Sequence, residues 1–176
     1  MKLAPIGRPL KFNFHNPHKI AAVALIIYPD EEHETRLILI KRNHYEGVHS
    51  GQVSFPGGKQ EIDDSSLAQT ALRESNEEIG VNIDSLTLLR KLSKIYIPPS
   101  NFLVSPFLFF SDNNLNFELN NEVKNILTPC LTDVLNFQIN NYENESIVNP
   151  YFIYNNFKIW GATAMILNEF VEIIKE

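Results

Sequence analysis

The sequence predicts an α/β fold, in which an α/β/α sandwich is built on a mixed β-sheet. Strand-like apolar segments lie on both sides of one predicted amphipathic helix, and a second amphipathic helix is predicted near the C-terminal end. A length of 176 residues suits one domain with a substantial core. We therefore expect an irregular N-terminal arm over residues 1–19 and a single domain over residues 20–176.

The first strands follow the arm, whose prolines and polar residues favour irregular structure. Residues 20–28 are apolar and rich in β-branched side chains, which predicts a strand buried on both faces. Residues 36–42 predict a second strand, with isoleucines on one face and leucines on the other. It ends in the basic pair Lys41 and Arg42. Either this pair meets a substrate phosphate, or it is the solvated end of a strand.

A sharp turn is predicted after a short strand over residues 51–55. Pro56, Gly57 and Gly58 form this turn, where glycine lets the backbone approach a ligand closely. A helix is then expected to begin at one of the N-cap candidates Asp63, Asp64, Ser65 and Ser66, of which Ser66 has capping-box spacing to Gln69, and to end at a glycine at position 80. Its small and apolar stripe, suited to packing on a sheet, consists of Ala68, Ala71, Leu72, Ser75 and Ile79.

Three glutamates on this helix are related by three or four positions. Glu74, Glu77 and Glu78 should project from one side of the helix, away from the apolar stripe. Like charges at this spacing destabilise a helix by roughly 0.2 to 0.5 kcal/mol per pair unless something neutralises them. A divalent cation would do so, because hard cations take carboxylate, carbonyl, water and phosphate oxygens. Arg73 is placed to hold a neighbouring carboxylate.

A solvated acidic face is the alternative, but the spacing of five residues argues against it. The pattern Arg73-Glu74-x-x-Glu77-Glu78-x-Gly80 behind a Gly-Gly turn resembles the Nudix box. At a usage of about 6% per residue, these five arise together in about one window in a million.

Two features depart from the general pattern of the box. The interval from Gly58 to Arg73 is one residue longer, and either Asp64 or Ser65 stands where the first glutamate is expected.

A second resemblance precedes the box. Residues 40–59, IKRNHYEGVHSGQVSFPGGK, are similar to a signature of the coenzyme A pyrophosphatases of the Nudix superfamily. Asn43 replaces a serine of that signature, and Gly47 replaces its second arginine. Six positions keep its spacing: Arg42, Gly51, Phe55, Pro56, Gly57 and Gly58.

These resemblances imply metal-assisted hydrolysis with Mg²⁺ or Mn²⁺. Glu74 and Glu78 would be the principal ligands, Glu77 a further ligand or base, and the Gly58 carbonyl another ligand, while Arg73 would orient the glutamates. Nudix enzymes generally add an acidic residue from outside the box, for which Glu122 is the candidate and Glu118 its rival. The residues expected to bind substrate are Lys41, Arg42, Phe55, Gly57 and Lys59.

Most of the rest of the chain is interpreted as scaffold, apart from the rigid loop over residues 98–101, which is a candidate wall of the substrate cleft. Residues 86–97 and 102–110 predict strands, residues 132–136 a helical turn, and residues 147–160 a hairpin around Asn155 and Asn156. The final helix has a core-facing stripe, and Trp160 before it is interpreted as a core anchor. The stripe consists of Ile166, Leu167, Phe170, Val171 and Ile174.

Composition excludes several classes of function. A formal charge of −6 argues against nonspecific binding to nucleic acid or to an anionic membrane. A single cysteine, Cys130, excludes an internal disulfide and a multi-cysteine zinc site. The longest apolar run is too short to span a bilayer and no signal-peptide pattern is present, so a cytoplasmic protein is expected.

Three functions stay open at this point. The first is hydrolysis of coenzyme A or acyl-CoA at its diphosphate, and the second is hydrolysis of another nucleoside diphosphate derivative such as ADP-ribose or NADH. The third is a non-catalytic nucleotide-binding domain, which would have no need for three mutually repelling glutamates. The oligomeric state, including a homo-oligomer, is left open.

Overall fold

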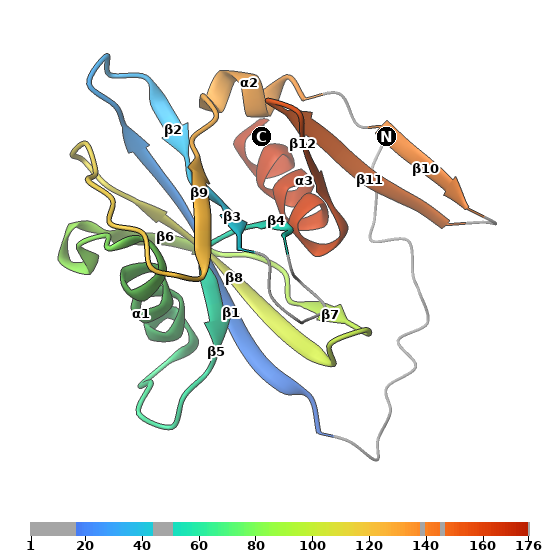
Figure 1. The fold of residues 1–176 in the computed structure, drawn as a ribbon, viewed down its shortest axis with the longest axis horizontal. Coiled ribbons are helices and arrows are strands. Elements are labelled where there is room, and N and C mark those ends of the chain that lie inside the picture. The colour runs from blue at the N-terminus through green and yellow to red at the C-terminus, as the bar shows by residue number, and fades with distance from the viewer. Residues whose placement is uncertain (1–16, 44–50, 138–139, 145–146, 176) are drawn as a thin grey trace.

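A computed structural model describes residues 17–43, 51–137, 140–144 and 147–175. Most of the predicted N-terminal arm therefore lies outside the described residues. The largest sheet has six strands (Figure 1): β1 (Lys19–Pro29), β2 (Thr35–Leu37), β5 (Gly57–Lys59), β6 (Thr87–Lys91), β7 (Ile95–Ile97) and β8 (Phe102–Phe110). The segment predicted as one strand over residues 86–97 thus forms two strands, whereas β8 has the predicted limits.

β1 is the central strand, and its pairing makes the sheet mixed. It runs parallel to β8 along nine residue pairs and antiparallel to both β2 and β5. Successive side chains of β1 enter two different cores: Leu25 and Ile27 belong to one, and Ala24 and Ile26 to the other. Burial on both faces is therefore confirmed, and so is the predicted α/β fold with a mixed sheet.

Two helices cover the two faces of this sheet (Figure 1). α1 (Leu67–Ile79) packs on the face that carries Ala22 and Phe109, and α3 (Gly161–Lys175) belongs to the core on the other face. Short side chains on β1 let α1 approach the sheet closely, which brings the helix next to β5. The predicted stripe of α3 is buried at four positions, but Ile174 is 39% exposed.

The strand predicted over residues 36–42 is divided between two sheets. Its first part, β2, pairs with β1, while β3 (Leu39–Arg42) joins a separate sheet with β4 (Val53–Ser54) and β9 (Val123–Leu127). The predicted faces are confirmed, because Ile38 and Ile40 enter the core under α1 and the leucines enter the other. This crossing carries Arg42 to the edge of α1.

The C-terminal elements close the second core. α2 (Leu131–Leu135) matches the predicted helical turn, and β10 (Asn140–Asn144), β11 (Ile147–Tyr154) and β12 (Phe157–Trp160) form a third sheet. The hairpin turns at Asn155 and Asn156, both with positive φ, as predicted. The prediction for Trp160 is wrong. Ile159 fills the core instead, and its neighbour Trp160 points outward, 49% exposed. Across the described residues, no helix is long and apolar enough to cross a membrane.

Candidate active site

The site begins at residues 56–58, which were predicted as a sharp turn and are called the glycine turn below. In the structure only Pro56 lies in a bend, because Gly57 and Gly58 already belong to strand β5 and run beside β1. Gly57 and Gly58 are paired with Val23 and Ala22. Gly57 has a φ of +148°, and a Cβ there would lie 2.3 Å from the Ala22 carbonyl oxygen. Only glycine fits at this position, because the backbone of β1 occupies the space of a side chain.

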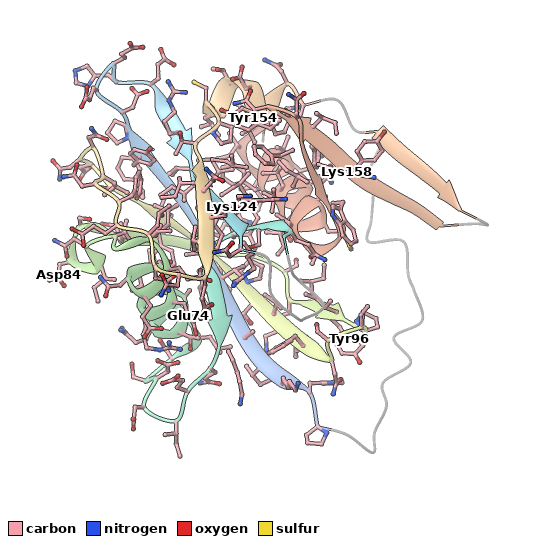
Figure 2. The ribbon with its side chains drawn as sticks, viewed as in Figure 1. Glu74, Asp84, Tyr96, Lys124, Tyr154 and Lys158 are labelled. Carbon is pink, nitrogen blue, oxygen red and sulfur yellow. The ribbon has the colours of Figure 1, made fainter. Side chains whose placement is uncertain are left out.

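α1 is fixed at both ends as the sequence predicts. The Ser66 hydroxyl accepts a hydrogen bond from the Gln69 backbone N–H at 3.1 Å, and Gly80, at φ +68°, donates its N–H to the Asn76 carbonyl. These caps set which turn of α1 crosses β5. As a result Glu74 lies over Gly58, on the side of the helix facing β5 (Figure 2).

Arg73 holds three carboxylates at once. Its guanidinium donates to both oxygens of Asp64 at 3.0 and 3.2 Å, and to Glu74 and Glu77 at 3.0 Å each. It also donates to the Lys59 carbonyl at 3.0 Å, which ties α1 to the glycine turn. The contact lowers the pKa of Asp64 to about 2. Asp64 and Ser65 were the two candidates for the position of the first glutamate of the Nudix box. Of these, Asp64 is the residue that pairs with this arginine.

Glu78 is buried, with only 2% of its surface exposed. The expectation that it projects away from the packed side of the helix is wrong, because the glycine turn covers it. One carboxylate oxygen accepts from the Gly57 N–H at 2.8 Å, and the other lies 2.8 Å from Arg42 Nη2 without hydrogen-bond geometry. Burial raises the pKa of Glu78 to about 7, although Arg42 and the Gly57 N–H oppose the shift.

Arg42 connects the glycine turn to the second sheet. Its Nη2 donates to the Gly57 carbonyl at 2.8 Å, and its Nη1 lies 3.7 Å from a carboxylate oxygen of Glu122. The structure thus brings Arg42, Gly57, Glu78 and Glu122 together from four segments. Glu118 instead meets the C-terminal end of α1, where its N–H donates to the Ile79 carbonyl.

Sequence reasoning missed two asparagines beside Glu122. Asn43 and Asn120 both make hydrogen bonds to the Glu122 backbone. The one available signal was that Asn43 directly follows Arg42 and replaces a residue of the signature.

Three of the predicted substrate-binding side chains take no part in the contacts described above. Lys41 points to the opposite face of β3 from Arg42, where its Nζ donates to the Gly51 carbonyl and lies 5.5 Å from the centre of the Phe157 ring. Phe55 is buried in the core under α3. Lys59 has an exposed side chain, and only its carbonyl contacts the described site residues.

The donor set fits a hard divalent ion that shares its coordination with water and substrate. Burial raises the pKa of Glu74 against the lowering influence of Arg73, and Glu78 has a buried oxygen without a hydrogen-bond partner. Within the described ranges, however, no three His, Cys, Asp or Glu side chains converge tightly enough to hold an ion alone. Mg²⁺ commonly takes one or two carboxylates and completes its shell with water and phosphate oxygens, which suits this arrangement.

The profile of the NUDIX domain matches residues 17–136 of the chain, a span that contains every residue of this site. The chain belongs to the Nudix family. As a Nudix hydrolase, it belongs to a group of enzymes that generally need divalent metal ions.

The chain is similar to known proteins in sequence and, at lower identity, in fold. The uncharacterized Nudix hydrolase NudL of Yersinia pestis (strain Pestoides F) is 30% identical over 167 residues, covering 92% of this chain and 81% of that protein. The Nudix hydrolase RenU of M. smegmatis has a similar structure, with a TM-score of 0.62 and 14% identity over 90% of this chain and 86% of that one. A bifunctional NMN adenylyltransferase/ADP ribose pyrophosphatase from Francisella tularensis, complexed with AMP and a Mn ion, gives a TM-score of 0.54 at 20% identity, covering 65% of this chain and 34% of that one.

Proposed function

We propose that this Nudix hydrolase cleaves the diphosphate linkage of coenzyme A or an acyl-CoA. The products would be 4′-phosphopantetheine, or its acyl form, and adenosine 3′,5′-bisphosphate. The supporting observation is the contact of Arg42 with both Gly57 and Glu78. It links two parts of the coenzyme A pyrophosphatase signature, the arginine and the glycine turn, to a glutamate of the Nudix box.

Each residue of the site has a role in this reaction. Glu74 and Glu78 would hold Mg²⁺ or Mn²⁺, with the Gly58 carbonyl as a further donor. When bound, the ion lowers the pKa of water and neutralises charge on the phosphoryl oxygens. Glu77, which is exposed, takes the proton of the attacking water as base. Arg73 keeps two of these glutamates in place.

The substrate would meet the site on the side of Arg42 and Glu122. Arg42 already faces two carboxylates, so a phosphate of the substrate would compete for its remaining donors. Lys59 is exposed next to the glycine turn and is the better candidate for the 3′-phosphate, because Lys41 points to the other face of β3. Glu122 is the second candidate for the base.

A panel of substrates tests the proposal. Coenzyme A, 3′-dephospho-coenzyme A, ADP-ribose and NADH are incubated with the protein and Mg²⁺ or Mn²⁺, with a chelated control, and the products are identified by mass. A charged hydrogen bond contributes about 1.5 to 3 kcal/mol, so coenzyme A should exceed its dephospho form by about 10- to 150-fold in kcat/KM. Lys59→Ala should reduce this preference, and Lys41→Ala should not.

A second candidate function follows from one difference in the signature. Gly47, which lies outside the described residues, replaces the second arginine of the coenzyme A signature. If ADP-ribose or NADH is cleaved as well as coenzyme A, or better, the enzyme is a pyrophosphatase for another nucleoside diphosphate derivative. A non-catalytic nucleotide-binding domain would instead bind the panel and release no product.

A further inference from the structure

The strand pair β3 and β9 changes register at the active site. Leu39, Ile40 and Lys41 face Leu127, Ile126 and Asn125 in regular antiparallel order, but Arg42 faces Val123 instead of Lys124. One extra residue, Lys124, therefore lies in β9 as a bulge; its position on β9 is labelled in Figure 2. Bulges of this kind redirect side chains next to active sites.

The shift decides which residue lies opposite Asn43. In the regular register Asn43 would face Val123, whereas after the bulge it faces Glu122. The Asn43 N–H donates to the Glu122 carbonyl at 2.7 Å, and its side-chain Nδ2 donates to the preceding carbonyl, that of Asn121, at 3.0 Å. Asn43 thus holds the Glu122 backbone from the side of β3.

Asn120 holds the same residue from the side of α1. Its side-chain oxygen accepts from the Glu122 N–H at 2.8 Å, and its own N–H donates to the Glu78 carbonyl at 3.2 Å. The peptide groups on both sides of the Glu122 Cα are therefore fixed. The Glu122 N–H is tied through Asn120 to α1, and the Glu122 carbonyl is tied through Asn43 to the end of β3.

These contacts form a closed ring around the site. Glu78 is joined to Asn120, Asn120 to Glu122, Glu122 to Asn43, and the neighbour of Asn43, Arg42, returns to Glu78. The Glu122 carboxylate itself is 69% exposed, with Arg42 at 3.7 Å. Its side chain is therefore directed by how its backbone is held more than by packing.

We propose that Asn43 and Asn120 are positioning residues for hydrolysis, which act by fixing the Glu122 carboxylate opposite Glu78. The inference rests on the proposed place of Glu122 in the site and not on coenzyme A as the substrate. A displacement of about 1 Å of a reacting group from its productive position lowers turnover, without weakening substrate binding in proportion. Removal of the Asn43 or the Asn120 side chain should therefore affect kcat more than KM.

The test is a double-mutant cycle with Glu122, using the panel compound that the wild-type enzyme hydrolyses fastest. Asn43→Ala and Asn120→Ala are made alone and combined with Glu122→Gln, and Asn125→Ala on β9 serves as the matched control. Each single asparagine variant should lose about 3- to 10-fold in kcat with KM changed less than about 2-fold, because each loses one hydrogen bond. In the Glu122→Gln background the same changes should have almost no further effect.

Urea unfolding of every variant separates this role from a structural one. Losses of kcat that are equal in the wild-type and Glu122→Gln backgrounds would overturn the proposal, since the asparagines would then act independently of Glu122. A full-activity Glu122→Gln enzyme would overturn it as well. Failure of the coenzyme A proposal would only change which compound is used, so the two results are distinguishable.

Discussion

A methyl group on Gly58 would lie 2.5 Å from the Cδ and Oε2 atoms of Glu74. The glycine turn is thus shaped to accommodate a carboxylate, in addition to the backbone of β1 on its other side. The Glu74 carboxylate is the end of a flexible side chain. It can therefore move when a methyl group at position 58 fills its space, whereas a backbone group cannot.

Gly58→Ala should therefore remove activity and leave the fold in place. We expect kcat to fall by about 100-fold because the Glu74 carboxylate is displaced, with a free energy of unfolding changed by less than about 1 kcal/mol. Steady-state kinetics and urea unfolding measure both. Gly161→Ala is the control. Gly161 has a φ of +63° and open space around it. The alanine substitution should therefore lower the free energy of unfolding by about 1 to 2 kcal/mol and leave kcat unchanged. Equal kcat in wild-type and Gly58→Ala enzymes would contradict this role of the turn.

Asp64→Asn should destabilise the protein, because Asp64 accepts two hydrogen bonds from Arg73. The pKa of Asp64 is lowered from 3.8 to about 2, so its contribution is present above pH 3.8 and is lost as the pH falls toward 2. We expect a loss of about 1 to 2 kcal/mol at pH 7. This difference from wild type should shrink below pH 3.8 in urea unfolding. The exposed neighbour Asp63 provides the control variant Asp63→Asn, which should change the free energy of unfolding at pH 7 by less than about 0.5 kcal/mol.

Glu77→Gln should separate chemistry from stability most clearly. The Glu77 side chain is 52% exposed and its pair with Arg73 is at the surface, so unfolding should change by less than about 1 kcal/mol. A loss of the base or of a ligand should lower kcat by about 100-fold or more at saturating Mn²⁺. If Glu77→Gln and Glu78→Gln both retain wild-type kcat, the assignment of this cluster as the catalytic centre is wrong.

Local patterns in the sequence predicted much of the fold. Alternation along residues 36–42 placed the isoleucines and leucines on the correct faces, and Ser66 and Gly80 marked the ends of α1 within one residue. Both follow from geometry that depends only on neighbours in sequence. Trp160 was misplaced for the opposite reason. Which face of β12 is covered depends on packing against distant elements, and a large aromatic residue gives no sign of the exposed face.

The sequence indicated candidate residues for the site, but not how they are arranged in space. Helical spacing gives the angles between Glu74, Glu77 and Glu78. It does not show that the Gly57 segment, 21 residues before Glu78, buries Glu78 almost completely and that Glu74 is buried in part. Nor does spacing distinguish Asp64 from Ser65, since the choice depends on the reach of Arg73. The bulge at Lys124 decides what lies opposite Asn43, and no pattern in β9 indicates it.

Burial of Glu78 makes the stability of the metal-free protein depend on pH. Its pKa in the folded protein is about 7, above the 4.5 of an unperturbed glutamate, because burial disfavours the charged form. A raised pKa means that the folded state binds the proton more tightly. This contribution to stability is fully present below pH 4.5 and is lost as the pH rises through 7.

Glu78→Gln should therefore stabilise the chelated protein at high pH, although it removes activity. Glutamine keeps an oxygen that can accept from the Gly57 N–H and carries no charge, so it imitates the protonated form. Relative to wild type, the variant should gain up to about 3 kcal/mol at pH 8 and show almost no difference at pH 4, in urea unfolding with chelator. Mn²⁺ should stabilise the wild-type protein at pH 8 more than the variant, because the ion compensates the charge that burial penalises. A variant that is less stable than wild type at pH 8 without metal would show that Arg42 already neutralises Glu78 completely.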